Sequence, residues 1–241
     1  MEYNKEWFSV EIKNDILTLT MNAPENNLMT ADFLVNYEAA AEEILFEFKD
    51  GKNIKGMIIR GGGRHFSVGA DVSALSERSA EELSKMENGE IIIPETHIHQ
   101  KKMVTSWKNM PFPVVSAIGG FCIGSGSEIA AACHFRICEK NARIGQPEST
   151  FGILPALGGI AETIKICGVK NAVKMVYSGE LLSAAEVFEL NWADIVTDKK
   201  KSFSEAVSLI EFISEQDEEF DFEKKARYLA EFLNERKNLH E

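Results

Sequence analysis

The chain of 241 residues lacks the segments that would place it in a membrane or outside the cell. No apolar run approaches the roughly 20 residues that a membrane-spanning helix needs. The first residues, Met1 to Glu6, lack the basic and then apolar order of a signal peptide. We therefore expect a cytoplasmic protein without a membrane partner.

Cysteine is scarce, and histidine occurs only five times. The cysteines lie inside apolar runs without the paired spacing of metal sites, so we interpret them as buried free thiols of a reducing compartment. A lone His-x-His at His97 and His99 is more typical of ordinary surface than of a ligand pair. We predict no metal site. The cysteines are Cys122, Cys133, Cys138 and Cys167.

Dense positive charge is also missing. The formal net charge is -12, so the molecule repels polyphosphate at long range, and nucleic acid is not an expected partner. The longest basic run, Lys199 to Lys201, is typical of a solvated turn. No Gly-x-Gly-x-x-Gly occurs, and no lysine follows the glycines of residues 119–124 as a nucleotide-binding loop requires.

The hydrophobic content of 44% is enough for one large core, and its pattern predicts an α/β protein. A core over residues 1–200 is followed by a helical region over 201–241, which we expect to serve as oligomer contacts or a lid. We expect Thr30 to cap a helix over residues 31–48, and Ser183 with Glu186, like Ser79 with Glu82, to form capping boxes. Strands are predicted at 8–12, 16–21, 57–59, 114–118, 135–138 and 194–196, and later helices at 128–133, 160–167, 172–177, 184–190, 203–213 and 222–234.

Two glutamates twenty positions apart, Glu128 and Glu148, each stand at a turn beside a short apolar run. Paired carboxyl groups can take a proton from water and deliver another to carbon, if nearby N–H groups stabilise the negative charge that develops in between. The glycine-rich turn over residues 119–126 precedes a predicted helix, and unpaired N–H groups at a helix start attract such charge. A second donor could come from the turn at Gly69 and Ala70.

Five segments in order resemble the crotonase, or enoyl-CoA hydratase/isomerase, superfamily. They are residues 66–71 (Phe-Ser-Val-Gly-Ala-Asp), 113–120, 124–129, 145–148 (Gly-Gln-Pro-Glu) and 152–159. The resemblance spans most of the chain. It implies a crotonase-type spiral of β-β-α units with a helical C-terminal region, assembled as a homotrimer or a dimer of trimers.

The same resemblance implies site residues and an activity. The N–H groups of Ala70 and Ser125 would form an oxyanion hole, with Glu128 and Glu148 flanking the water and the substrate. Having both glutamates favours an enoyl-CoA hydratase that acts on a trans-2-enoyl thioester of CoA or a carrier protein, with CoA only as part of the substrate and no other cofactor. Substrate contacts are expected from Arg64, Val68, Gly69, Ala70, Asp71, Val72, Gly124 and Ser125.

Some positions depart from the family pattern and keep alternatives open. Ser125 stands where hydratases usually carry glycine, and Ala23 replaces the usual arginine before Pro24. The alternatives are an isomerase, a hydrolase or a decarboxylase of the family that acts on an acyl thioester, and a scaffold that binds acyl thioesters without turnover. A further one is a hydrolase with Cys122 as nucleophile in a strand-to-helix turn and His134 or His240 as partner.

Overall fold

The computed structural model describes residues 3–5, 7–51, 53–71, 95–216 and 219–238. The predicted capping box at Ser79 and Glu82, together with Val72 and His240, lies outside these residues. Across the described part of the chain, no helix combines the length and the apolar composition that crossing a bilayer requires.

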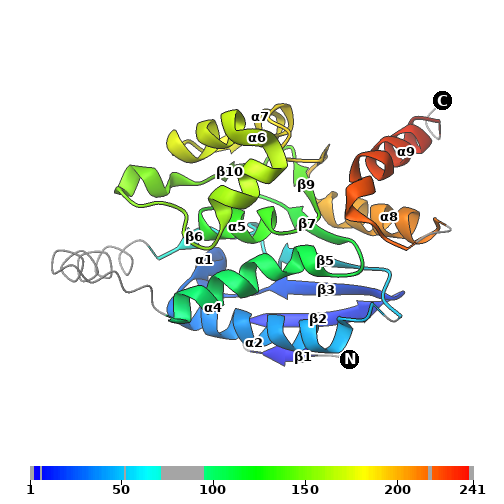
Figure 1. Ribbon diagram of the computed structural model, residues 1–241, viewed down its shortest axis with the longest axis horizontal. Helices are drawn as coiled ribbons and strands as arrows, with labels where there is room; N and C mark the ends of the chain where they lie inside the picture. The colour runs from blue at the N-terminus through cyan, green and yellow to red at the C-terminus, as the bar shows by residue number, and fades with distance from the viewer. Residues whose placement is uncertain (1–2, 6, 52, 72–94, 217–218, 239–241) are drawn as a thin grey trace.

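A seven-stranded sheet forms the centre of the molecule (Figure 1). Each of its first three strands is antiparallel to its neighbour among them, and each later strand of the sheet is parallel to the one before it. Every residue of β7 is buried, as expected for parallel strands covered on both faces. The order is β1 (Tyr3–Lys5), β2 (Phe8–Lys13), β3 (Ile16–Met21), β5 (Gly56–Gly61), β7 (Val114–Ile118), β9 (Phe135–Glu139) and β12 (Ile195–Thr197).

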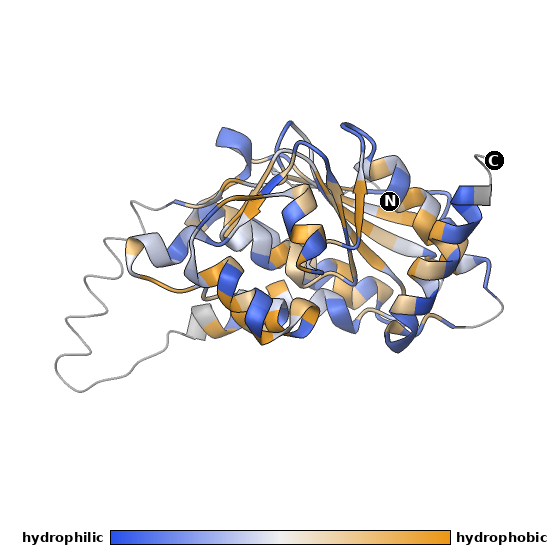
Figure 2. Cartoon of the chain, turned by 90° about the horizontal axis from the view of Figure 1, so that it is seen from above, coloured by the Kyte–Doolittle hydropathy of each residue, from blue (hydrophilic) through white to orange (hydrophobic). Residues whose placement is uncertain are grey.

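Two hydrophobic layers cover the two faces of this sheet. One contains Phe33 of α2 (Ala31–Phe48), Trp107 of η1 (Thr105–Asn109) and Ile129 of α5 (Ser125–Ala131). The other contains residues of α8 (Ser202–Ser214) and α9 (Lys225–Asn238), so the C-terminal helices pack on the sheet. Figure 2 shows the hydrophobic strands inside and hydrophilic residues on the outer sides of the helices.

Two small sheets carry the turns that matter for function. Strand β10 (Arg143–Gly145) lies between β8 (Phe121–Ile123), to which it is parallel, and β11 (Leu182–Ser183), to which it is antiparallel. Strand β4 (Leu28–Met29) pairs with β6 (Gly69–Ala70). The remaining elements are α1 (Pro24–Asn27), α4 (Glu95–Val104), η2 (Pro147–Phe151), α6 (Gly159–Tyr177), α7 (Ala184–Glu189) and η3 (Phe222–Lys224).

The structure confirms the α/β class and most of the predicted long elements, but helix α4 and strand β10 were not predicted, and two predicted segments differ. Helix α2 begins after Thr30, whose side chain accepts a hydrogen bond from the N–H of Phe33. The capping box of Ser183 and Glu186 is present on α7. The two helices predicted over 160–167 and 172–177 are one element, α6, interrupted at Gly168, where φ is 76°. Strand β8 lies inside the segment predicted only as a glycine-rich turn.

Candidate active site

Glu128 lies in the first turn of α5 with only 2% of its surface exposed. Its Oε1 accepts a hydrogen bond of 2.8 Å from the N–H of Gly159, the first residue of α6. Position 159 needs a glycine, because a Cβ there would stand 2.5 Å from Cγ of Glu128. Burial raises the pKa of Glu128 to about 8; the Gly159 N–H opposes this shift, and the charge of Glu148 adds to it.

Glu148 lies on the short helix η2, directly after Pro147. The residue is half-buried, and within the described structure its Oε2 is buried without a hydrogen-bond partner. Burial raises the pKa of its carboxyl group to about 7. Both glutamates therefore favour the neutral form more than an exposed carboxyl group does.

The turns at Gly69 and Gly124 meet beside Glu148. Both glycines have positive φ, 85° and 54°. A Cβ on Gly124 would stand 3.0 Å from Oε1 of Glu148 and 3.9 Å from Cα of Gly69. A Cβ on Gly69 would stand 2.7 Å from the carbonyl oxygen of Ile123. The close approach of two backbones and a carboxyl group thus depends on two positions without side chains.

Ala70 and Ser125, whose N–H groups are the predicted donors of the oxyanion hole, directly follow Gly69 and Gly124 in the chain. Ser125 is the first residue of α5, so its N–H has no acceptor within the helix. Its φ is not positive, so the serine side chain adds no left-handed strain. Ala70 ends β6, whose pairing with β4 fixes the path of the segment that follows Gly69.

Asn27 and Ser67 hold the first turn in place, and sequence reasoning missed both. The side-chain amide of Asn27 donates to the carbonyl oxygen of Phe66 at 2.9 Å. The hydroxyl of Ser67 donates to the carbonyl oxygen of Asn27 at 2.7 Å and accepts from the N–H of Gly69 at 3.0 Å. Asn27 itself has a φ of 62°, as do few residues other than glycine, asparagine and aspartate. An asparagine at the end of an irregular turn after Pro24 was the available signal.

Polar groups without partners surround Glu128. Gln146 is fully buried, and neither its amide nitrogen nor its oxygen has a hydrogen-bond partner in the described structure. A Cβ on Gly159 would stand 2.7 Å from Nε2 of Gln146 and 2.8 Å from Oε1 of Glu128, so the two side chains are neighbours. The hydroxyl of Ser127 is also buried without a partner. Such groups are costly unless water or a ligand satisfies them, which is typical of a binding site.

The remaining predicted contact residues divide into two places. Val68 and Asp71, both half-buried, flank the turn at Gly69 and Ala70. Arg64 lines a cavity at the carboxyl edge of the main sheet. Neither Glu128 nor Glu148 lines this cavity. Its contact with a CoA phosphate stays a prediction.

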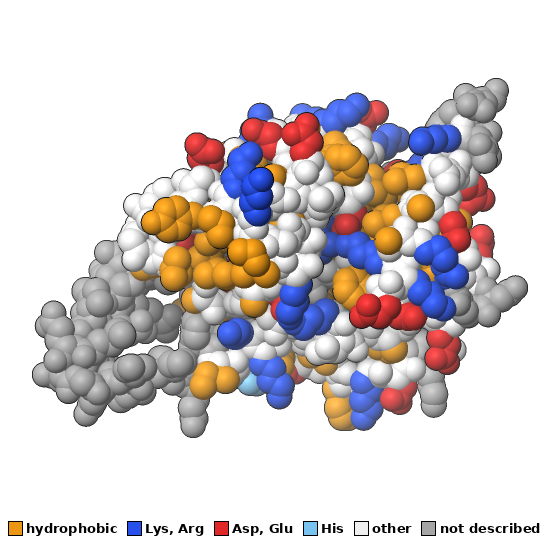
Figure 3. Space-filling model, turned by 45° about the horizontal axis from the view of Figure 1, so that its top comes forward, with side chains coloured by type: hydrophobic (Ala, Val, Ile, Leu, Met, Phe, Trp, Pro, Cys, Tyr) orange, Lys and Arg blue, Asp and Glu red, His pale blue; other side chains and the backbone are white. Residues whose placement is uncertain are grey.

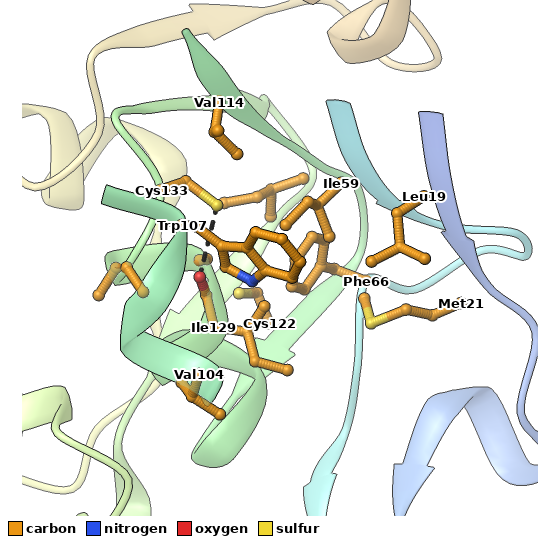
Figure 4. Close-up of a cluster of buried hydrophobic side chains, with 14 of the residues drawn as sticks. Leu19, Met21, Ile59, Phe66, Val104, Trp107, Val114, Cys122, Ile129 and Cys133 are labelled. Atoms are coloured by element: carbon orange, nitrogen blue, oxygen red, sulfur yellow. Dashed lines mark hydrogen bonds between the residues drawn. The ribbon is translucent and has the colours of Figure 1, made fainter. Parts of the chain in front are cut away.

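The environment of Cys122 argues against its role as a nucleophile. Its side chain is fully buried among Trp107, Phe66 and Ile129 (Figure 4), and burial raises the pKa of its thiol well above the ordinary range. The candidate base His134 is engaged elsewhere: Nδ1 accepts from the N–H of Val114, and Nε2 lies 3.0 Å from the carbonyl oxygen of Lys108. Burial lowers the pKa of His134 to about 4.

The histidine and cysteine residues form no metal site within the ranges that the structure describes. Nε2 of His99 lies 3.2 Å from a carboxyl oxygen of Glu42 on the neighbouring helix. Cys133 and Cys138 are buried free thiols, with the Sγ of Cys133 against the carbonyl oxygen of Ile129 (Figure 4). These residues belong to the surface and the core.

Comparison with known proteins gives the family. The sequence pattern of the family described as enoyl-CoA hydratase/isomerase matches residues 11–226, which is most of the chain. The chain belongs to this family. Both glutamates and both glycine turns of this enoyl-CoA hydratase/isomerase family member fall inside the matched range.

Curated relatives agree with the family assignment. The chain is 27% identical over 189 residues to the "Probable enoyl-CoA hydratase" of Bacillus subtilis (strain 168), covering 78% of this chain and 67% of that protein. It is 30% identical over 208 residues to the fatty acid oxidation complex subunit alpha of Shewanella frigidimarina (strain NCIMB 400). That match covers 84% of this chain but only 28% of the subunit, so the chain corresponds to a small part of these longer relatives.

Solved structures of the family have the same fold. An enoyl-CoA hydratase from Bacillus anthracis superposes with a TM-score of 0.70 at 25% identity, covering 88% of this chain and 78% of that chain. An enoyl-CoA hydratase structure from Geobacillus kaustophilus HTA426 superposes with a TM-score of 0.72 at 22% identity, covering 97% of this chain and 89% of that chain. The predicted crotonase-type fold is therefore confirmed for this family member.

Proposed function

We propose that the protein is an enoyl-CoA hydratase, which adds water across the double bond of a trans-2-enoyl thioester. The arrangement of the glutamate pair beside the glycine turn carries the proposal. Glu128 and Glu148 are close enough for their charges to interact, both have a pKa raised toward neutral pH, and Glu148 touches the glycine turn that precedes Ser125. Acid/base groups work best when their pKa lies near the operating pH.

In the proposed mechanism, Glu128 accepts a proton from water as the water oxygen bonds to the β carbon. The electron pair of the double bond moves toward the thioester oxygen, and the N–H groups of Ala70 and Ser125 stabilise the resulting enolate. Glu148 then gives its proton to the α carbon. Loss of one such N–H donor typically costs about 10²–10³ in rate.

The reaction needs one proton on the glutamate pair. Because the two carboxyl groups interact, they titrate as a pair, and the reactive form carries its one proton on Glu148 while Glu128 is ionised. Burial gives Glu128 the higher pKa, about 8 against about 7 for Glu148, so this form is the less populated of the two singly protonated forms before the substrate binds. The activity should therefore have a bell-shaped pH dependence whose two limbs belong to the pair. The hydrogen bond from the N–H of Gly159 supports a fixed position for the carboxyl group of Glu128.

We further propose that the substrate is a thioester of CoA or of a carrier protein, that no other cofactor takes part, and that the protein works in the cytoplasm as a homotrimer or a dimer of trimers. Exposed hydrophobic side chains support an assembly. Figure 3 shows such side chains gathered on one face. Large exposed ones on η2 and α6 and in the loop between them are Phe151, Leu154, Val169, Val173 and Tyr177.

The test is a panel of trans-2-enoyl-CoA thioesters of several chain lengths, followed by loss of the conjugated chromophore. The wild type should turn over at least one of them, and Glu148→Gln should lower kcat by about 10²–10⁴. The matched control is Glu189→Gln, an exposed glutamate on α7, which should keep wild-type kcat. Wild-type turnover by Glu148→Gln would count against the mechanism.

A second arm separates hydration from the alternatives. Trans-3-enoyl thioesters that gain the conjugated chromophore would identify an isomerase, and release of free CoA would identify a hydrolase. Tight binding of the thioesters without turnover would identify a scaffold.

A further inference from the structure

A cavity of about 660 Å³, apart from the glutamate pair, lies at the carboxyl edge of the main sheet. Its walls come from the loop after β5 (61–66), from the ends of β7 and β9, and from the segment that leads into α8 (199–203). None of the four proposed catalytic residues lines it. Its volume is in the range of small-molecule binding sites, roughly 300–1,000 Å³.

The path of the chain explains why this cavity exists. The loop after β5 turns toward the layer that contains Phe66 and α5. The connection after β12 turns to the opposite layer, where α8 packs against β5, β7 and β9. The loop after β5 and the connection after β12 thus leave the same edge of the sheet toward opposite faces, and residues of both line the cavity.

The cavity is cationic although the protein is acidic. Arg60, Arg64, Lys199 and Lys200 line it, against one carboxylate, Glu139. Glu139 is buried and accepts a hydrogen bond of 3.1 Å from the hydroxyl of Ser202. A local excess of positive charge in a molecule of net charge -12 attracts anions to this one place.

Arg60 is held in position before any ligand binds. Its Nε donates to the hydroxyl of Thr20 at 3.1 Å, and its guanidinium group lies 4.5 Å from the ring centre of Phe203. A guanidinium group fixed in this way loses little freedom on binding an anion. The cavity therefore has one rigid cation and three on exposed side chains.

Helix α8 adds to the positive potential. It is 13 residues long, and its N-cap residue, Lys201, makes no side-chain cap hydrogen bond. The N–H groups of its first turn and the positive end of the helix dipole lie at the wall that contains Ser202 and Phe203. Arginine, lysine and a helix N-terminus together are the donors that proteins use for phosphate groups.

We propose that this cavity binds a small ligand that carries a phosphate or diphosphate group. The site is separate from the glutamate pair, and the proposal does not depend on hydratase activity. The phosphate could belong to a free small anion or to the nucleotide end of CoA, and the two sources share the same contacts.

Calorimetric titration with pyrophosphate at low salt tests the site. The wild type should bind it, with an affinity that falls as salt is added. The double variant Lys199→Gln/Lys200→Gln should bind at least about tenfold more weakly, since two charged contacts are lost. The matched control is Lys170→Gln/Lys174→Gln, which removes the same charge from exposed positions on α6 and should bind as the wild type does.

Circular dichroism and thermal unfolding establish that both double variants are folded. No binding of pyrophosphate by the wild type, or equal binding by the two double variants, would overturn the proposal. A competition arm identifies the source: CoA that displaces pyrophosphate assigns the cavity to the nucleotide end of CoA, and CoA that does not displace it assigns the cavity to a separate phosphate ligand.

Discussion

Two groups of charged residues, the network of Arg136, Asp194 and Lys225 and the pair of Glu128 and Glu148, differ in how fully their polar atoms are hydrogen-bonded. Asp194 accepts from Nη2 of Arg136 at 2.8 Å and from the N–H of Arg136 at 2.7 Å, and it lies 2.6 Å from Nζ of Lys225. Arg136 also donates to three carbonyl oxygens, of Trp192, Cys133 and His134. Each nitrogen of the Arg136 guanidinium group and both carboxylate oxygens of Asp194 therefore have a partner.

The glutamate pair is the opposite case. The carboxyl group of Glu128 accepts a hydrogen bond from the N–H of Gly159, but Glu148 has a buried oxygen without a partner, and the amide of Gln146 has no partner in the described structure. The comparison teaches that complete pairing of buried charge fixes the fold, whereas incomplete pairing leaves groups that a ligand can satisfy.

Breaking the charge network should have the largest effect. Asp194→Ala leaves Arg136 and Lys225 buried without their carboxylate, so we expect the free energy of unfolding to fall by roughly 3–5 kcal/mol. Denaturation with urea measures it. The control is Asp198→Ala. The carboxylate of Asp198 pairs with Lys140 at the surface, so its loss should cost much less than the loss of Asp194. Equal losses in the two variants would contradict the comparison.

Removing a single donor from the site should affect activity and not the fold. Ser125→Pro deletes the N–H of Ser125, and proline is well tolerated as the first residue of a helix. We expect kcat to fall by about 10²–10³ with the circular dichroism spectrum unchanged. Ser125→Ala retains the N–H and should stay close to the wild type. Full activity of the proline variant would exclude Ser125 as an oxyanion donor.

The incomplete pairing at the glutamates should make stability depend on pH. Burial raises the pKa of Glu128 from the ordinary 4.5 to about 8, so the folded chain holds a proton that the unfolded chain releases. The stabilisation from this proton is complete below the unfolded pKa and is lost as the pH rises toward about 8.

Glu128→Gln removes this titration. We expect the fall in the free energy of unfolding between pH 5 and pH 8 to become smaller by roughly 2–3 kcal/mol than in the wild type. Urea denaturation at several pH values measures it. Glu189→Gln, on the surface, should keep the wild-type dependence. An unchanged dependence in Glu128→Gln would show that its carboxyl group titrates normally.

The smallest effect is expected at a satisfied polar group on the surface. The Ser183 hydroxyl accepts from the N–H of Glu186 at the start of α7, and the carboxylate of Glu186 accepts from the N–H of Ser183. Ser183→Ala should lower the free energy of unfolding by about 1 kcal/mol. Ser183→Thr keeps the cap and should cost less. A loss as large as that of Asp194→Ala would mean that burial is not what separates the two cases.

The fold was predictable where the sequence contains local signals. Helix α2 was correct at both ends, because Thr30 caps it and its apolar residues follow the helical period. Strands β8 and β10 were missed, because three-residue strands have no period and exist through pairing with each other over about twenty positions. Likewise Gly168 interrupts α6 without ending it, which the glycine alone does not indicate.

The candidate site shows the same division. Glu128 and Glu148 could be singled out because each stands in a motif with glycine or proline beside it. Asn27 and Ser67 could not, since they act through hydrogen bonds to backbone groups about forty positions away. The burial of Gln146 beside Gly159 likewise depends on how η2 and α6 meet, which no local pattern contains.

The one-directional strand order has a consequence for synthesis. From β3 onward, each strand of the seven-stranded sheet pairs with a strand of that sheet already made, so a chain leaving the ribosome can extend this sheet without waiting for later segments. The face of the sheet that contains Ile58, Val115 and Phe135 nevertheless stays exposed to solvent until α8 and α9 are made and pack on it. A nascent chain halted before Ser202 would contain both glutamates and yet expose a hydrophobic surface on this face. The last forty residues therefore protect the protein against aggregation by covering that surface.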